Sequence, residues 1–167
     1  GVSVPFGMVQ LSPDTDTILY SNGQGYNKDV YRYCAGYQYS DNTITGFSHT
    51  HFSGTGHSDL GDFLLMPTTG KIQLNPGTSS NPESGYRSRF FHENEKASPG
   101  FYSVLLSDYN ILAELTTTQR VGFHRYTFQK SGESHLIIDV GHQQGESSTV
   151  TDAFARWVNK NEVEGYV

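Results

Sequence analysis

The stretch GFYSVLLSDYNILAELTTTQRVGFHRYTFQ (residues 100–129) contains three short strand-like runs, at 100–108, 111–119 and 120–129. The runs are rich in aromatic and β-branched residues, which favour strands, and turn-forming residues such as those of DYN separate the first two. Similar runs lie on either side, YRSRFFHE (86–93) before the stretch and SHLIIDVGH (134–142) after it. Short strands at regular spacing with turns between them predict an all-β antiparallel sandwich.

The remainder of the chain fits the same class. The predicted extended segments are 3–12, 31–40 with tyrosines at every second position, 43–52 as the hairpin partner of 31–40, and 62–77 as two strands around a Thr-Thr-Gly turn. The run SSTVTDAFARWVNK (147–160) fits neither a helix nor a strand clearly, and NEVEGYV (161–167) predicts the start of a strand. Residues 1–167 are therefore expected to form one β-sandwich domain.

Composition excludes several classes of function. Seventeen acidic residues against eleven basic ones give a formal charge of −6, which argues against nucleic acid as a partner. No apolar run approaches the roughly 18 residues that cross a bilayer, so no membrane span is expected. Cys34 is the single cysteine and is expected to be a buried, small apolar side chain. Because the chain opens on Gly1 and stops within a strand-like run, we expect a fragment of a longer protein.

The stretch GFSHTHFSGTGHSDLGD (46–62) concentrates the polar chemistry of the chain. On a strand, His49 and His51 would share a face, where they could bind one metal ion with His57 or Asp59. Against a metal site, the chain has neither paired cysteines nor an HExxH motif, which are the stronger zinc signatures.

Two other interpretations of this stretch concern its aspartates and glycines. Asp59 and Asp62 could be a catalytic carboxylate pair, but closely spaced aspartates are more often turn caps or acceptors for the hydroxyls of a sugar. Gly54 and Gly56 lack the lysine of a phosphate-binding loop, and they more plausibly allow positive φ or close approach to a ligand.

Three blocks of sequence resemble the amino-terminal domain of glycoside hydrolase family 92, the calcium-dependent, inverting exo-α-mannosidases. The blocks are VPFGMVQLSPDT (4–15), AGYQYSDNTITGFSHTHFSGTGHSDLGDFLLMPTTG (35–70) and LTTTQRVGFHRYTF (115–128). They occur in order and span most of the chain, which makes the resemblance more specific than any one block.

The resemblance implies a galactose-mutarotase-like supersandwich followed by a helical (α/α)₆ domain that this chain lacks. That second domain would carry the catalytic acid, the base and most calcium ligands, while loops of the sandwich form one wall of the sugar pocket. The resemblance further implies mannose-containing glycans as substrates, α-1,2 linkages among them, and export to the periplasm or cell surface of a bacterium. The chain alone would contain no catalytic residue and would be inactive.

Carried over position by position, the resemblance places a set of residues in the sugar-binding wall. Phe6 would pack against the sugar, the Gly7 backbone would approach it, and histidines and an aspartate would donate or accept hydrogen bonds. The predicted wall residues are Phe6, Gly7, His49, His51, Gly54, Gly56, His57, Asp59 and Asp62. Some family members carry cysteine where His57 stands and an aromatic residue where Leu60 stands, which leaves the preferred linkage open.

Two alternatives remain open at this point. One is a free-standing carbohydrate-binding module without catalysis, which titration with mannose oligosaccharides would reveal. The other is a small histidine metalloprotein, which metal analysis would reveal.

Overall fold

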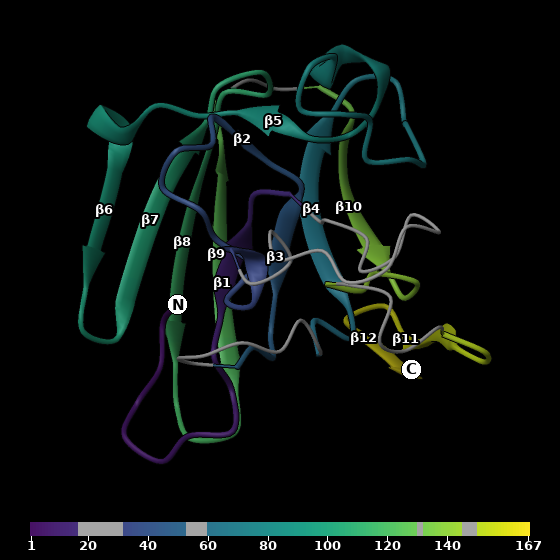
Figure 1. Cartoon of the computed structure of the whole chain (residues 1–167). Coiled ribbons are helices and arrows are strands. Elements are labelled where there is room, and N and C mark those ends of the chain that lie inside the picture. The colour runs from purple at the N-terminus through teal and green to yellow at the C-terminus, as the bar shows by residue number, and fades with distance from the viewer. Residues whose placement is uncertain (17–31, 53–59, 130–131, 145–149) are drawn as a thin grey trace, which may run out of the picture.

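The computed structural model describes residues 1–16, 32–52, 60–129, 132–144 and 150–167. Two four-stranded antiparallel sheets, in the orders β6-β7-β8-β9 and β1-β3-β4-β10, lie side by side in Figure 1, and the pairs β2-β5 and β11-β12 flank them. The strands are β1 (Ser12–Asp14), β2 (Thr43–Ile44), β3 (Gly46–Ser48), β4 (Leu64–Thr69), β5 (Ser88–Arg89), β6 (Glu95–Ser98), β7 (Phe101–Leu106), β8 (Ile111–Thr117), β9 (Gly122–Phe128), β10 (Ser134–Asp139), β11 (Phe154–Asn159) and β12 (Glu162–Tyr166). The short 3₁₀ helices η2 (Pro82–Ser84) and η3 (His92–Asn94) lie between strands.

Alternation along the strands builds the core. In β8, the side chains of Ile111, Ala113 and Leu115 are buried, whereas those between them are partly exposed. Phe47 of β3 faces them from the other sheet, and its ring centroid lies 6.1 Å from that of Tyr126 in β9. Each large apolar side chain removed from water in this way contributes about 1.5–3 kcal/mol to stability. The two facing sheets confirm the predicted all-β sandwich.

The strands predicted at 100–108, 111–119, 120–129 and 134–142 are confirmed. The segment predicted at 3–12 belongs to a strand only at Ser12, and the predicted hairpin of 31–40 with 43–52 is wrong. The segment 31–40 is not a strand within its described residues, because Gly36 has φ +76° and its N–H donates to the Tyr33 carbonyl in a turn. The segment 43–52 finds other partners: β2 pairs with β5, and β3 pairs with β1 and β4.

The segment 62–77 holds one strand instead of two. Only β4 forms there, and β10 supplies its partner along the whole strand, from Ser134 opposite Thr69 to Asp139 opposite Leu64. The undecided run 147–160 contains β11, and β12 confirms the strand predicted at 161–167. Cys34 is buried, as expected.

The buried carboxylate of Asp14 links the two edges of the β1-β3-β4-β10 sheet, which are formed by β1 and β10. Asp14, at the end of β1, has no exposed surface. Its Oδ1 lies 2.8 Å from both His51 Nε2 and Gln144 Nε2, and its Oδ2 lies 2.8 Å from His142 Nε2 and 2.5 Å from Ser48 Oγ. We refer to these five side chains as the Asp14 cluster.

The cluster keeps Asp14 ionised despite its burial. Burial by itself favours the neutral acid, but the charge of His51 and the hydrogen bonds from His142 and His51 outweigh it and hold the pKa of Asp14 well below its ordinary value. The other ring nitrogen of His51, Nδ1, lies 2.7 Å from the Gln10 carbonyl. Both nitrogens of His51 therefore face oxygen atoms of the protein. A buried charge paired in this way is costly to disrupt, at about 3–5 kcal/mol when one partner is removed.

Gly36 lies in the segment 31–40, where alternating tyrosines predict a strand. Its backbone packs directly against the Asp14 cluster. A Cβ at this position would lie 1.8 Å from Asp14 Oδ1 and 2.7 Å from the nearest nitrogens of His51 and Gln144. The left-handed φ and the close contact both require glycine here.

We predict that Gly36→Ala lowers the free energy of unfolding by at least about 3 kcal/mol, because it combines backbone strain with a collision against a buried ion pair. Gly100→Ala is the matched control, since Gly100 has φ +75° and a Cβ added there would meet no atom within 4 Å. The control should lose only about 1 kcal/mol, from backbone strain alone. Urea unfolding of both variants tests this, and equal losses would contradict the packing role of Gly36.

Candidate functional site

Backbone strain coincides with the predicted sugar-binding wall. In the described ranges, three residues other than glycine have positive φ: Phe6 at 58°, Leu60 at 72° and Asn110 at 52°. Asn110 lies in the turn between β7 and β8, where asparagine tolerates this conformation. Phe6 and Leu60 have no such tolerance, and each belongs to a segment that the sequence assigned to the wall. Strain of this kind is often retained at functional sites.

The Phe6 loop presents an aromatic ring to solvent. Its backbone is held by the Gly7 N–H, which donates to the Val4 carbonyl at 3.0 Å, and by the Met8 N–H, which donates to the Gln119 carbonyl at 2.8 Å. The Phe6 side chain is nevertheless fully exposed. A large apolar side chain held outward by a strained backbone contributes little to this domain, and it suits contact with a ligand or a second domain. The loop is the purple one at the bottom of Figure 1.

His49 belongs to a chain of three polar rings between the sheets. Its Nε2 lies 3.1 Å from Nε2 of His124 in β9, and Nδ1 of His124 lies 2.8 Å from the Tyr126 hydroxyl. The His49 ring also stacks on Phe63, with centroids 4.4 Å apart. The Nδ1 atom of His49 has no hydrogen-bond partner within the described ranges. That nitrogen is buried, so it does not face solvent.

Both histidines of this chain of rings are neutral at pH 7. Burial, with a smaller contribution from the charge of His51, lowers the pKa of His49 to about 4. Burial, followed by the neighbouring His49, lowers the pKa of His124 to about 3. A neutral imidazole can donate through one nitrogen and accept through the other, which suits recognition of a hydroxyl group.

His49 and His51 do not converge on a common point. Strand β3 ends at Ser48, so the alternation expected for a strand does not extend to these residues. His49 contacts His124 and Phe63, whereas His51 is buried in the Asp14 cluster. Both nitrogens of His51 have protein partners, so we assign it a role in bracing the wall rather than in touching a ligand.

A second set of contacts closes the base of the loop that follows His51. The Gly61 N–H donates to the Thr50 carbonyl at 2.9 Å, and the Thr50 hydroxyl donates to Asp62 Oδ2 at 2.7 Å. A Cβ on Gly61 would lie 2.8 Å from Cγ of Gln144. Because Gln144 also binds Asp14, the base of this loop rests directly on the Asp14 cluster.

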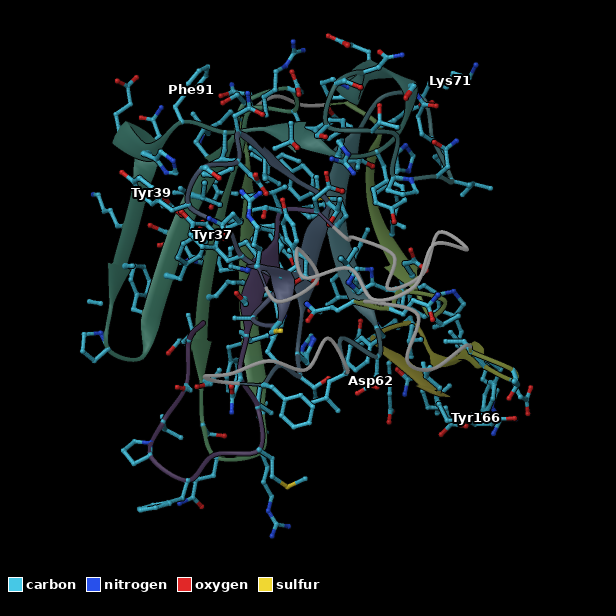
Figure 2. The ribbon with its side chains drawn as sticks, in the orientation of Figure 1. Tyr37, Tyr39, Asp62, Lys71, Phe91 and Tyr166 are labelled. Atoms are coloured by element: carbon cyan, nitrogen blue, oxygen red, sulfur yellow. The ribbon has the colours of Figure 1, made fainter. Side chains whose placement is uncertain are left out.

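Asp62 itself is exposed and lines a cavity of about 220 Å³. Leu60, His142, Thr151 and Asp152 also line this cavity, which we call the Asp62 cavity. Figure 2 shows Asp62 below the centre of the view, above and to the left of Tyr166. Leu60, which has positive φ, and His142 of the Asp14 cluster thus both line the Asp62 cavity.

The structure describes only some of the predicted wall residues. Gly54, Gly56, His57 and Asp59 lie outside the described residues, so their predicted roles stay predictions. Within the described ranges, no three His, Cys, Asp or Glu side chains are placed to hold a metal ion.

The sequence analysis did not identify four members of the Asp14 cluster as functional residues: Asp14, Ser48, His142 and Gln144. Asp14 looks like a turn residue there, although it lies inside one of the matched blocks. Its partners His142 and Gln144 are 128 and 130 positions away in the chain, so no local spacing could have paired them.

Comparisons with known proteins agree on one family. The family model described as the glycosyl hydrolase family 92 N-terminal domain matches residues 1–167. The structure of the family GH92 α-mannosidase BT3965 from Bacteroides thetaiotaomicron superposes with a TM-score of 0.88 and 41% identity, covering 99% of this chain and 20% of that one. The family GH92 inverting mannosidase BT2199 from the same species superposes with a TM-score of 0.59 and 25% identity, covering 82% of this chain and 16% of that one.

A curated relative adds to the comparison. An uncharacterized secreted glycosidase of Arthroderma benhamiae is 28% identical over 130 residues, which is 77% of this chain and 15% of that protein. The chain thus spans only about a fifth, or less, of the length of these relatives.

The neutral His49–His124 pair makes stability depend on pH. Both folded-state pKa values lie below the ordinary value of 6.5, so the unfolded chain binds more protons as the pH falls from about 6.5 toward 4. We predict that the free energy of unfolding decreases by at least about 3 kcal/mol between pH 7 and pH 4.5 through this pair.

Urea unfolding across this pH range measures the effect. His49→Phe should remove about half of the pH dependence, since it leaves one buried imidazole. His135→Gln is the control, because the His135 ring bonds to the Gly70 carbonyl on the surface and should leave the wild-type dependence intact. An unchanged dependence in His49→Phe would contradict the assignment.

Proposed function

Because this chain belongs to the glycosyl hydrolase family 92 N-terminal domain family, we propose that it forms one wall of the sugar pocket of a calcium-dependent, inverting exo-α-mannosidase. The proposed substrates are mannose-containing glycans, with α-1,2 linkages among the bonds cleaved. The observation that carries the proposal is the match of 99% of the chain to an α-mannosidase at 41% identity and a TM-score of 0.88. The similarity to an inverting mannosidase of the same family supports the stereochemistry.

The catalytic carboxyl groups are proposed to lie in another domain of the same protein. An inverting glycosidase needs an acid and a base on opposite sides of the scissile bond. Within the described ranges, Asp62 is the one carboxylate predicted for the wall, and it is held at the base of a loop by the Thr50 hydroxyl. The proposed partner is a helical (α/α)₆ domain that supplies both groups, and the present chain would then be inactive alone.

Calcium is also proposed to bind mainly outside this chain. Among the described residues, no three His, Cys, Asp or Glu side chains are grouped to hold a metal ion. The proposal assigns the ion mainly to the helical domain, as the resemblance to family 92 implies.

The residues of this chain would orient the sugar and exclude water from it. The exposed Phe6 ring provides an apolar surface for one face of the pyranose. Neutral His49 lies behind this surface, because its Nδ1 is buried and its Nε2 faces His124, and its ring stacks on Phe63. The Asp14 cluster holds His51 in place and, through Gln144, packs against Gly61.

We further propose that the protein is exported, to the periplasm or the cell surface. The secreted glycosidase from Arthroderma benhamiae supports export. No helix in the described ranges is long and apolar enough to cross a membrane.

Replacing Phe6 by glycine in the intact enzyme tests the wall directly. Glycine adopts positive φ without strain, so we predict an unchanged or slightly raised melting temperature. The value of kcat/KM for α-mannosides should fall by at least about tenfold, because the apolar contact with the sugar is lost.

Met8→Ala is the matched control, since Met8 is an exposed apolar residue in the same loop. It should change kcat/KM by less than about twofold. Wild-type kinetics in the Phe6→Gly enzyme would contradict the role of Phe6 in the wall.

A further inference from the structure

The turn between β8 and β9 is fixed by its own hydrogen bonds. The Thr118 N–H donates to the Val121 carbonyl at 2.9 Å, and the Val121 N–H donates to the Thr118 hydroxyl at 3.2 Å. Gln119 and Arg120 lie between these two residues, at the end of the hairpin, and both are exposed. The backbone that carries Arg120 is therefore rigid although its side chain faces solvent.

The Phe6 loop packs against this turn. The Met8 N–H donates to the Gln119 carbonyl at 2.8 Å, and a Cβ added to Gly7 would lie 3.5 Å from Cα of Gln119. Figure 1 shows the two loops beside each other at the bottom of the view. We refer to residues 4–8 and 118–121 together as the tip, because these contacts make them one unit.

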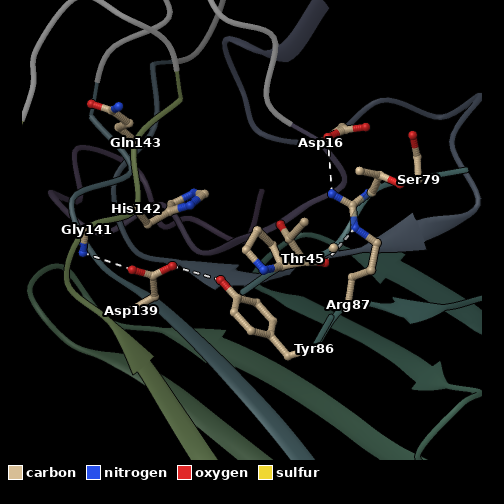
Figure 3. A pocket seen from close by; sticks show the side chains of 12 residues that line it. Asp16, Thr45, Ser79, Tyr86, Arg87, Asp139, Gly141, His142 and Gln143 are labelled. Carbon is tan, nitrogen blue, oxygen red and sulfur yellow. Dashed lines mark hydrogen bonds and ion pairs between the residues drawn. The ribbon is translucent and has the colours of Figure 1, made fainter. Parts of the chain in front are cut away.

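Arg120 has no hydrogen-bond or ion-pair partner among the residues that the structure describes. Four other arginines of the described ranges are ion paired with Asp or Glu residues: Arg87, Arg89, Arg125 and Arg156. Figure 3 shows one of these pairs, between Arg87 and Asp16. Residues 1–13 and 115–132 contain no Asp or Glu, so the two segments that build the tip supply no partner for Arg120.

The residue types of the tip are typical of a buried contact. Besides Arg120, the tip exposes the apolar side chains of Phe6 and Val121. Aromatic residues and arginine are enriched at the centres of protein interfaces. A surface that covers these apolar groups would also remove Arg120 from water, and an unpaired buried cation is costly. The covering surface must therefore supply negative charge, and a carboxylate matches a guanidinium through two parallel hydrogen bonds.

Two kinds of partner could meet the tip in the proposed enzyme. A mannose glycan is neutral, so it could contact Phe6 but could not neutralise the charge of Arg120. Another domain can do so, and there is enough protein for one, because this chain covers only 20% of the α-mannosidase that matches 99% of it. The charge of Arg120 thus favours a protein surface over the substrate.

We propose that Arg120 forms an ion pair with a carboxylate of the helical domain and thereby docks the tip on that domain. The proposal rests on the proposed function. Because the hydrogen bond from Met8 to Gln119 joins the turn to the Phe6 loop, docking of Arg120 also sets the position of Phe6 beside the sugar. Arg120 is a positioning residue that acts through Phe6 and does not touch the substrate.

Charge reversal in the intact enzyme tests the effect on catalysis. Arg120→Glu should lower kcat/KM for α-mannosides by at least about tenfold, because it places like charges together, whereas Arg120→Lys should stay within about threefold of the wild type. Lys71→Glu is the matched control, since Lys71 is exposed and lies at the upper right of Figure 2, far from the tip. Wild-type kinetics in Arg120→Glu, or an equal loss in Lys71→Glu, would contradict the proposal.

A cross-link without a spacer identifies the partner. In the intact Arg120→Lys protein, a water-soluble carbodiimide joins the introduced amine to a carboxylate in contact with it, and mass spectrometry of the digested protein locates both ends. We expect a link from the tip to an Asp or Glu outside residues 1–167, which the wild type cannot form because it has no lysine in the tip. Lys71 is the internal control and should not link to that carboxylate.

The cross-link separates this proposal from the proposed function. No link from position 120, a link to a second copy of the protein, or a link only to a carboxylate of residues 1–167 such as Asp59 would overturn the docking of Arg120. Hydrolysis of α-mannosides without the expected link would leave the proposed function standing. If the intact protein hydrolyses no α-mannoside, the proposed function fails, and the cross-link decides the docking by itself.

Discussion

The ion-paired carboxylate of Asp14 is the constraint on which the described site depends. A fully buried charge is tolerated only with close partners, and Asp14 receives them from the end of β3 and from the segment after β10. These partners fix three other features. His51 anchors the chain next to Thr50, Gln144 packs against Gly61, and His142 reaches the Asp62 cavity. The polar interior thus holds the described residues on either side of positions 53–59.

The buried residues of this domain support the site, and its exposed residues are the ones that can contact a ligand. This arrangement fits one wall of a binding site. The Asp14 cluster is buried and hydrogen bonded, whereas Phe6 and Asp62 face outward. Phe6 combines a strained backbone with an exposed ring. Such strain is often retained where a residue contacts a ligand or another domain. This arrangement agrees with the proposal that this domain orients the sugar and that another domain supplies the bond-breaking carboxyl groups.

The sequence predicted the regular part of the fold well. Strands β7 to β10 follow from short apolar runs between turns, because neighbouring antiparallel strands are encoded locally. The strand predicted at 31–40 was wrong because alternating tyrosines imitate a strand, while contact with Asp14 forces left-handed φ at Gly36. The partner of β4 was missed because β10 lies more than 60 positions away. Separations of 34 to 130 positions in sequence hid the Asp14 cluster, and the end of β3 at Ser48 separated His49 from His51.

The central claim is that this domain shapes the sugar site while the chemistry lies elsewhere in the protein. The most direct measurement is α-mannoside hydrolysis, with and without calcium, by the intact protein and by the separate domain of residues 1–167. Circular dichroism should first show that the separate domain keeps its β structure. We expect turnover by the intact protein and none by the folded domain. Calcium-dependent turnover by the domain alone would contradict the claim and would make Asp59 and Asp62 the candidate catalytic pair.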